Sequence, residues 1–472
     1  MKKKLISVLL SAAMVMSVMS GCGGSGQETK GAQTNGGETK AAQTTEQSTP
    51  AQTTAKETEG AVEETQDATK ETESGTKAAA KTEYTGDPVT LRVLMSSGWT
   101  EDAMKSIEPV LNESGISLEV EAYDWNTYEG KQRLAGTSKG GEYDLIFLPG
   151  NAVNIFAKAG ALVELNDVVS KVADNEDDYY DSVKRFSKVD DNWYVVPYSA
   201  EGMVYYYRTD LMTEDQLPKT IDEMYELGKS MTKDDMYGLA IPAGPGEAAC
   251  SFWSYFLWSY GGTYFDENWN PMLNTKEAVS AAEMFAKICK DCSPPGITTW
   301  QNEETVAAFQ SGQLAAMINW PGYWNQINDE SQSKVAGNIG VAPVPAGPVT
   351  DCPRFGTWGV GVTANCKNVD AAKVVVEEFT KKDTLRDCLQ YTSSALRSLN
   401  EEEGSAKINP TVPASIAHLD TADERPPIPE LNLYVPAVGA AINSIVAGNP
   451  AQETLDALND EVRKIMEDGG YY

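Results

Sequence analysis

From residue 87 to the C-terminus, strand-like and helix-like hydrophobic patterns alternate along the chain. Short runs rich in branched and aromatic residues predict strands where they end at Gly, Pro or Ser. We expect strands at 89–95, 117–123, 143–148, 315–318, 339–344 and 356–363. Strands that alternate with helices predict an α/β fold, with helices on both faces of a parallel or mixed sheet.

Helical spacing fills the segments between these strands. Thr220 and Glu223 form a capping box that opens a helix. Its apolar side is Ile221, Met224, Leu227 and Met231. Further helices are expected at 153–159, 276–291 and 370–381, and a last one has apolar residues at 455, 458, 462 and 465.

The N-terminus carries an export signal. Three lysines precede an apolar run at 5–19, and Ser20 and Gly21 come before Cys22, as in a secretory signal. Residues 19–22 also resemble the bacterial lipobox, whose cysteine is lipidated and becomes the mature N-terminus. We therefore expect a lipoprotein signal peptide at 1–21 and a lipid on Cys22 that holds the protein on a membrane. The alternative is an ordinary secretory cleavage with Cys22 in a disulfide.

Residues 22–86 have the composition of a stalk. Gln, Thr, Glu, Lys, Ala and Gly recur in near-repeats, and Tyr84 is the only aromatic residue. Such a segment cannot bury enough apolar surface to offset its chain entropy, so we expect a lipid-anchored disordered stalk. As a flexible coil it would span ~45 Å.

Size, charge and histidine content limit the function of the remaining part. About 390 residues exceed what one core usually supports, so two lobes are expected. The formal charge of −31 becomes about −34 once the signal lysines are removed, which argues against nucleic acid or anionic lipid as a partner. His418 is the single histidine, which leaves few ways to build a metal site or a histidine-dependent catalytic triad. We therefore expect no cofactor and no metal.

Two cysteines at 289 and 292 allow either a redox or zinc site or a packed helix face. Ala282, Phe285, Cys289 and Cys292 are spaced by three, four and three, which favours a helix face. No second cysteine pair or nearby histidine completes a zinc site. Core cysteines are therefore expected, and the pairing of the six cysteines beyond Cys22 stays open.

Five stretches in a fixed order carry a family resemblance. They are GEYDLIF at 141–147 with AGALVEL at 159–165, NWYVVPY at 192–198 with VYYYRTDL at 204–211, PKTIDEM at 218–224, FQSGQLAAM at 309–317, and IGVAPVP at 339–345 with GTWG at 356–359. Together they resemble family 1 of the extracellular solute-binding proteins of ABC importers, the maltose-binding-protein type.

The resemblance implies a two-lobe, type II periplasmic-binding-protein-like fold with three hinge crossovers and the ligand in the interlobe cleft. The first lobe is expected at 87–199 plus 339–390, and the second at 200–338 plus 391–472. The implied function is capture of a sugar or oligosaccharide by hinge closure and delivery to ABC permease subunits. A monomer without enzymatic activity is expected, on the outer face of the cytoplasmic membrane of a single-membrane bacterium.

A sugar receptor needs aromatic faces and paired polar groups. Trp320, Tyr323 and Trp358 lie beside Gly or Pro, which favours an open site over a packed helix. Trp253 shares helical spacing with Phe256 and Tyr260, so a core position is at least as well supported for it.

Polar ligand contacts are expected near the first crossover and at strand ends. Tyr198 and Glu201 follow the crossover proline at 197, and the resemblance places a cleft carboxylate at Glu201; a solvated surface acid is the alternative. Ser97 and Asn151 follow strands, where ligands of α/β sheets bind. Arg397 could bind two hydroxyls or a carboxylate through its fork.

The sequence is also compatible with other functions. A receptor for a polyamine, a peptide or an organic anion would use charged contacts in place of aromatic ones. A lipid-anchored glycoside hydrolase could pair Glu201 with Asp266, although no spacing fixes two acids. The acidic run at 174–178 lacks the glycine and distant Glu of a calcium loop, which favours a solvated turn.

Overall fold

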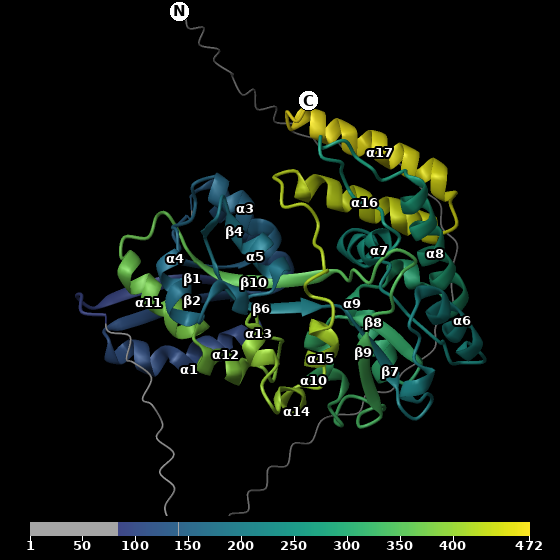
Figure 1. The fold of residues 1–472 in the computed structure, drawn as a ribbon, viewed down its shortest axis with the longest axis horizontal. Helices are drawn as coiled ribbons and strands as arrows, with labels where there is room; N and C mark the ends of the chain where they lie inside the picture. The colour runs from purple at the N-terminus through teal and green to yellow at the C-terminus, as the bar shows by residue number, and fades with distance from the viewer. Residues whose placement is uncertain (1–83, 140) are drawn as a thin grey trace, which may run out of the picture. The chain divides into compact units, whose positions relative to one another are not determined.

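The computed structural model describes residues 84–139 and 141–472, which fold around two β-sheets (Figure 1). The predicted signal peptide, the lipid on Cys22 and the predicted stalk up to residue 83 lie outside the described residues. Tyr84 packs against the first core, and its hydroxyl donates to the carbonyl of Asp87 at 3.1 Å. The folded domain therefore begins slightly before the predicted boundary at residue 87.

The first sheet has five strands in the order β2-β1-β3-β10-β6. β1 is parallel to β2 and β3, whereas β10 is antiparallel to β3 and β6. The strands are β1 (Val89–Ser96), β2 (Ile116–Tyr123), β3 (Leu145–Pro149), β6 (Val196–Gly202) and β10 (Phe355–Val362). A two-residue hairpin, β4 (Lys188–Val189) with β5 (Asn192–Trp193), lies outside this sheet.

Helices cover both faces of the first sheet, as the alternating pattern predicts. Because successive side chains of a strand point to opposite faces, Leu91 and Val93 join one cluster and Leu94 joins another. The first face carries α1 (Trp99–Glu113), α4 (Asn166–Val172), α5 (Asp181–Ser187) and α11 (Val369–Thr380). The second face carries α2 (Trp125–Thr137) and α3 (Gly150–Lys158). We call these elements the first lobe.

The second sheet is antiparallel and has the order β8-β7-β9. Its strands are β7 (Val204–Arg208), β8 (Ala316–Asn319) and β9 (Ile339–Pro343). The helices that share its core are α6 (Ile221–Met231), α7 (Glu247–Ser259), α8 (Lys276–Cys292), α9 (Asn302–Gln310), α10 (Trp324–Ile327), α16 (Leu431–Val446) and α17 (Ala451–Asp468). The capping box of α6 is present, with the Thr220 hydroxyl accepting from the Glu223 amide at 3.2 Å. We call these elements the second lobe.

Three crossovers join the lobes, and backbone hydrogen bonds tie them together. The first crossover is at Met203, between β6 and β7, and its amide donates to the carbonyl of Arg354 at 3.1 Å. The second runs from β9 to β10, and the third passes Asp423. Phe355 N donates to Asp423 O, and Asp423 N donates to Pro353 O, each at 3.2 Å. The predicted two-lobe fold with three hinge crossovers is confirmed.

Two predicted lobe boundaries need correction. Strand β9 pairs with β7, so residues 339–343 belong to the second lobe, and the chain returns to the first sheet only at β10. Residues 391–422 pack mainly with the first lobe, through the buried side chains of Ala395, Leu396, Leu399, Leu419 and Ala422. Short apolar strands do not show which sheet they join, because strand pairing depends on residues far apart in the sequence.

The segment that follows β10 completes the first lobe with short helices. These are α12 (Lys382–Cys388), α13 (Arg397–Asn400), α14 (Ser405–Ile408) and α15 (Val412–Ile416). Between α12 and α13, the Ala200 amide donates to Ser393 O at 3.2 Å and the Ala395 amide donates to Tyr198 O at 3.3 Å. Residues 393–395 therefore run along the free edge of β6, next to the first crossover.

The cysteines of the described residues lie in the protein core. All six cysteines after residue 84 are free thiols and buried, and Cys289 and Cys292 lie in the second core. Burial raises the pKa of Cys292 to about 12, which keeps this thiol protonated and unreactive. The core position predicted for both is confirmed.

Over residues 84–139 and 141–472, no helix is both long enough and apolar enough to cross a bilayer.

Candidate ligand site at the junction of the lobes

Strand β6 brings Tyr198 and Glu201 to the edge of the first crossover. Glu201 is partly buried, and its carboxylate accepts a hydrogen bond from the hydroxyl of Thr392. Burial raises the pKa of Glu201 to about 7, against the lowering effect of the Thr392 hydroxyl and the Ser393 backbone. Near neutral pH this carboxyl can therefore both donate and accept a hydrogen bond.

Aromatic rings surround the start of this strand. Tyr198 is 4% exposed and contacts the edge of Trp99, with ring centroids 5.8 Å apart. Trp99 in turn stacks on Tyr391 at 5.8 Å, with an interplanar angle of 8°. Trp99 and Tyr391 are both partly exposed. Tyr391 immediately precedes Thr392, so these rings and Glu201 form one group.

Trp99 and Tyr391 were not among the predicted site residues. The signal for Trp99 was present, because it follows directly after the strand end at Ser97 and Gly98. Tyr391 gave no such signal, since its place beside β6 depends on pairing between segments almost 200 residues apart.

Trp358 lies on β10, which pairs with β6, and Trp320 follows directly after β8 of the second sheet. The register pairs Gly356 with Glu201, and Trp358 with Ser199. A Cβ atom on Gly356 would lie 3.8 Å from the Trp320 ring, so this ring from the second lobe rests on a glycine of the first. Trp358 is partly buried, and its ring packs against that of Tyr128, with the ring centroids 6.1 Å apart. The structure therefore brings Tyr198, Glu201, Trp320 and Trp358 together around two paired strands.

Ser97 and Asn151 lie at the ends of neighbouring parallel strands. Ser97 is exposed after β1, and its amide donates to the carbonyl of Tyr123 at 2.7 Å. Asn151 is partly exposed in the first turn of α3, two residues after Pro149, which pairs with Trp358. Both positions agree with the strand-end argument, and their ligand contacts stay a prediction.

Trp253 does not reach this junction. It is 0% exposed in α7, where every residue except Glu247 is buried, and it packs edge-on against Tyr264 at 6.2 Å. Its helical spacing with Phe256 and Tyr260 was the better guide, because an all-round apolar helix is buried on every side. Trp253 is therefore removed from the candidate site.

Two further predicted residues have partners elsewhere within their own lobes. Arg397 donates to both carboxylate oxygens of Asp420, at 2.9 and 3.1 Å, and its guanidinium lies 4.3 Å from the Tyr180 ring centroid. Its fork is thus occupied, which argues against a ligand contact. Tyr323 donates to Glu303 of α9 at 3.0 Å and is partly exposed, so only part of its ring remains available.

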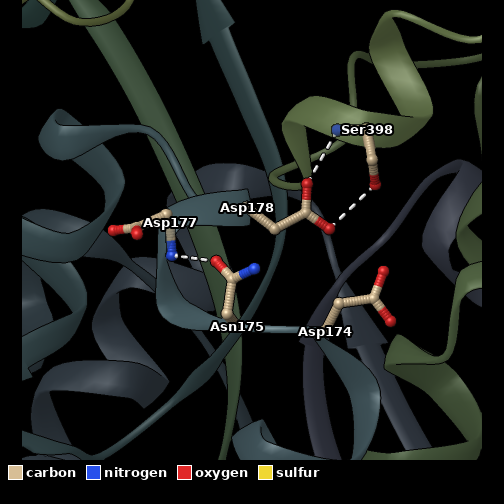
Figure 2. Close-up of a pocket in the computed structure, with 5 residues that line it drawn as sticks. All are labelled: Asp174, Asn175, Asp177, Asp178 and Ser398. Atoms are coloured by element: carbon tan, nitrogen blue, oxygen red, sulfur yellow. Dashed lines mark hydrogen bonds between the residues drawn. The ribbon is translucent and has the colours of Figure 1, made fainter.

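The acidic run at 174–178 lines a pocket of the first lobe (Figure 2). Asp178 accepts hydrogen bonds from the amide and hydroxyl of Ser398, both at 2.8 Å, and so caps α13. Lys382 lies 2.7 Å from Asp174 and 3.3 Å from Asp178. Most of the run is solvated as predicted, but Asp178 is a buried helix cap.

The part of the chain that the structure describes contains no group of three or more His, Cys, Asp or Glu side chains placed to hold a metal. The two carboxyls considered for a hydrolase lie in different settings. Asp266 accepts from Asn268 and Asn270 within its own turn, whereas Glu201 contacts Thr392.

Comparisons with known proteins agree with this architecture. A mannitol-binding protein of Pseudomonas aeruginosa is 24% identical over 78% of this chain and 91% of its own length. A protein of Sinorhizobium fredii, named as a probable amino-acid ABC transporter periplasmic-binding protein, is 26% identical over 84% of this chain and 93% of its own. An ABC transporter solute-binding protein of Agrobacterium radiobacter, solved with ribitol, has a TM-score of 0.71 at 23% identity and covers 80% of this chain and 99% of its own.

The relatives are named as binding proteins and not as enzymes. The family model of the bacterial extracellular solute-binding proteins matches residues 96–384. This range includes the first two crossovers, the whole second sheet and every strand of the first sheet except β1. The chain therefore belongs to the bacterial extracellular solute-binding protein family.

Proposed function

We propose that this protein is the capture receptor of an ABC importer for a sugar or a polyol. The observation that carries the proposal is the group at the lobe junction, where Glu201 lies near partly exposed aromatic rings. Family membership supports a non-covalent receptor, and the mannitol and ribitol named for two relatives support a polyhydroxylated ligand.

The chemistry of this group suits a neutral polyol. Trp99, Trp320 and Trp358 supply flat faces for the C–H surfaces of a carbon chain or ring. Glu201, with its raised pKa, supplies a carboxyl that can accept from one hydroxyl and donate to another. Ser97 and Asn151 would add neutral hydrogen bonds from the strand ends. Binding between the lobes would favour their closure, because the ligand would then contact both.

The location follows from the N-terminal sequence. We infer that Cys22 carries the lipid, that residues 23–83 act as a tether, and that the domain works at the outer face of the cytoplasmic membrane. It would deliver its ligand as a monomer to separate permease subunits. The lipid would then keep the receptor close to its transporter.

One relative supports a different ligand class. The Sinorhizobium fredii protein is named for amino acids, so an amino acid is the second candidate. Such a ligand carries two charges and needs charged partners at the site. Glu201 could pair with an ammonium group, whereas Arg397 is already paired with Asp420. This arrangement favours the neutral ligand.

Titration calorimetry of the mature protein against mannitol, ribitol, maltose, galacto-oligosaccharides and the amino acids tests this function. We expect saturable binding of one polyol or sugar, and its recovery unchanged after long incubation. Binding of an amino acid alone would refute the sugar proposal, and turnover of a glycan would refute the receptor proposal.

A further inference from the structure

Four charged side chains form an ionic cluster where the crossovers meet. Arg354 lies in the second crossover, Glu424 and Arg425 follow Asp423 in the third, and Glu247 begins α7. The side chains of Arg354, Glu424 and Arg425 are 7, 6 and 4% exposed, whereas that of Glu247 is half exposed. The cluster thus joins two crossovers to a helix of the second lobe.

Glu424 holds both arginines. Its Oε2 lies 2.9 Å from Arg354 Nη2, and its Oε1 lies 2.9 Å from Arg425 Nε. Glu247 completes the cluster at 2.5 Å from Arg425 Nη1 and 3.6 Å from Arg354 Nη2. Burial raises the pKa of Glu247, but Arg425 and Arg354 outweigh it and leave the pKa lowered, so the carboxylate is charged at neutral pH.

Close helix packing fixes the start of α7. Gly439 of α16 lies so near the backbone of Gly246 that a Cβ atom would be 1.9 Å from the Gly246 carbonyl oxygen. Glu247 therefore has little freedom in its backbone, and the arginines are held against a rigid element.

The guanidinium of Arg354 lies over the ring of Trp320. The guanidinium carbon lies 4.8 Å from the ring centroid. The Nε atom of Arg354 is buried and has no hydrogen-bond partner among the described residues, while Nη2 is held by Glu424. Trp320 also rests on Gly356, which follows Arg354 by two residues. The ring thus lies across the second crossover.

We propose that Arg354 is a positioning residue for ligand binding, whose guanidinium, anchored by Glu424, fixes the Trp320 ring at the hinge. The inference rests on the function proposed above, because it takes Trp320 as a ligand-stacking residue. A planar guanidinium fits flat against an indole, so it restricts the ring where an ammonium would not. A ring held before the ligand arrives lowers the ordering cost of binding.

Fluorine NMR of the mature protein labelled with 5-fluorotryptophan tests the positioning directly. Trp320→Phe identifies the Trp320 resonance among those of the ten tryptophans. We expect Arg354→Lys to shift and broaden this resonance and to leave that of Trp253, in the second core, unchanged. Arg425→Lys is the matched control, since it alters the same cluster without a contact to the ring, and it should leave the Trp320 resonance in place.

An unchanged Trp320 resonance in folded Arg354→Lys would overturn the inference, and so would an equal shift in Arg425→Lys. Glu424→Gln provides a second route if Arg354→Lys does not fold. It removes the anchor but keeps the guanidinium, and it should also shift the Trp320 resonance. No shift in that variant would count against the anchoring role.

Affinity for mannitol and ribitol adds a double-mutant test. Arg354→Lys should weaken binding by about threefold to tenfold, the range expected for a cation–π contact. In a Trp320→Phe background the same substitution should weaken binding by less than about twofold, because the indole that Arg354 holds is already absent. Equal losses in both backgrounds would overturn the coupling. If the unmodified protein binds a sugar in place of these polyols, the same double-mutant test uses that sugar. If it binds no sugar or polyol, the proposed ligand class is wrong, while the NMR result still decides whether Arg354 positions the ring.

Discussion

Two aromatic regions of this protein share composition but differ in their surroundings. In α7 of the second lobe, Trp253 and its neighbours are buried on every side and pack against other rings. At the lobe junction, Trp99 and Trp320 keep part of their surface exposed, beside Glu201, Gly356 and Arg354. Aromatic content alone therefore does not identify a ligand site. We expect partial exposure next to glycine and charged groups to be the better guide.

The largest difference between the regions should appear in stability. Trp253→Ala should lower the free energy of unfolding by about 3–5 kcal/mol, because it leaves a large cavity in a packed core. Urea denaturation measures this change. Trp253→Phe is the control and should cost much less, since the indole N–H of Trp253 has no hydrogen-bond partner among residues 84–139 and 141–472. A loss below about 1 kcal/mol for the alanine variant would mean that this region is not a tight core.

The junction should differ from the core in its response to pH. The pKa of Glu201 is raised to about 7 in the folded state, so the folded protein binds this proton more tightly than the unfolded chain does. Stability from this group is present at low pH and is lost as the pH rises from the unfolded value toward 7.

Glu201→Gln should remove that dependence. The unmodified protein should lose about 1–3 kcal/mol relative to the variant between pH 4.5 and 7.5. Parallel urea melts across this range measure the difference. If the free energy of unfolding changes equally with pH in both proteins, Glu201 titrates as a solvated surface acid, the alternative that its sequence position allowed.

Trp320 should affect ligand binding more than folding, in contrast to Trp253. Trp320→Ala should weaken polyol binding by about tenfold or more, because it removes a stacking face. Its cost in unfolding free energy should stay below that of Trp253→Ala, since the ring is only partly buried. Calorimetric titration and urea melts of both variants make the comparison. Equal affinities for Trp320→Ala and the unmodified protein would remove Trp320 from the site.

Local patterns allowed much of the fold to be predicted. The capping box at Thr220 and Glu223, and the helix face that buries Cys289 and Cys292, depend on residues a few positions apart, and both are present. The pairing of β9 with β7 does not depend on such spacing, so its lobe was misassigned. The partner strand of β9 lies more than 100 residues earlier in the chain.

The candidate site shows the same division. Ser97 was placed by a strand end, which is a local feature, whereas Glu201 was placed by the family resemblance, which implies a cleft carboxylate shortly after the crossover proline. Arg354 could not be found in this way, because its partners Glu247 and Glu424 come from distant segments that meet only at the hinge. A buried charge cluster leaves no periodic signal in the sequence.

The smallest effect is expected at Arg397, which the sequence placed in the site and the structure pairs with Asp420. Both side chains are substantially exposed, so Arg397→Ala should cost only about 0.5–1 kcal/mol of stability. Ligand affinity should change by less than about twofold, because an exposed ion pair contributes little energy. Asp420→Asn is the matched control, because it frees the guanidinium without removing it. If Arg397→Ala weakens polyol binding by about tenfold while Asp420→Asn does not, the guanidinium leaves Asp420 when the ligand binds, and the junction extends to α13.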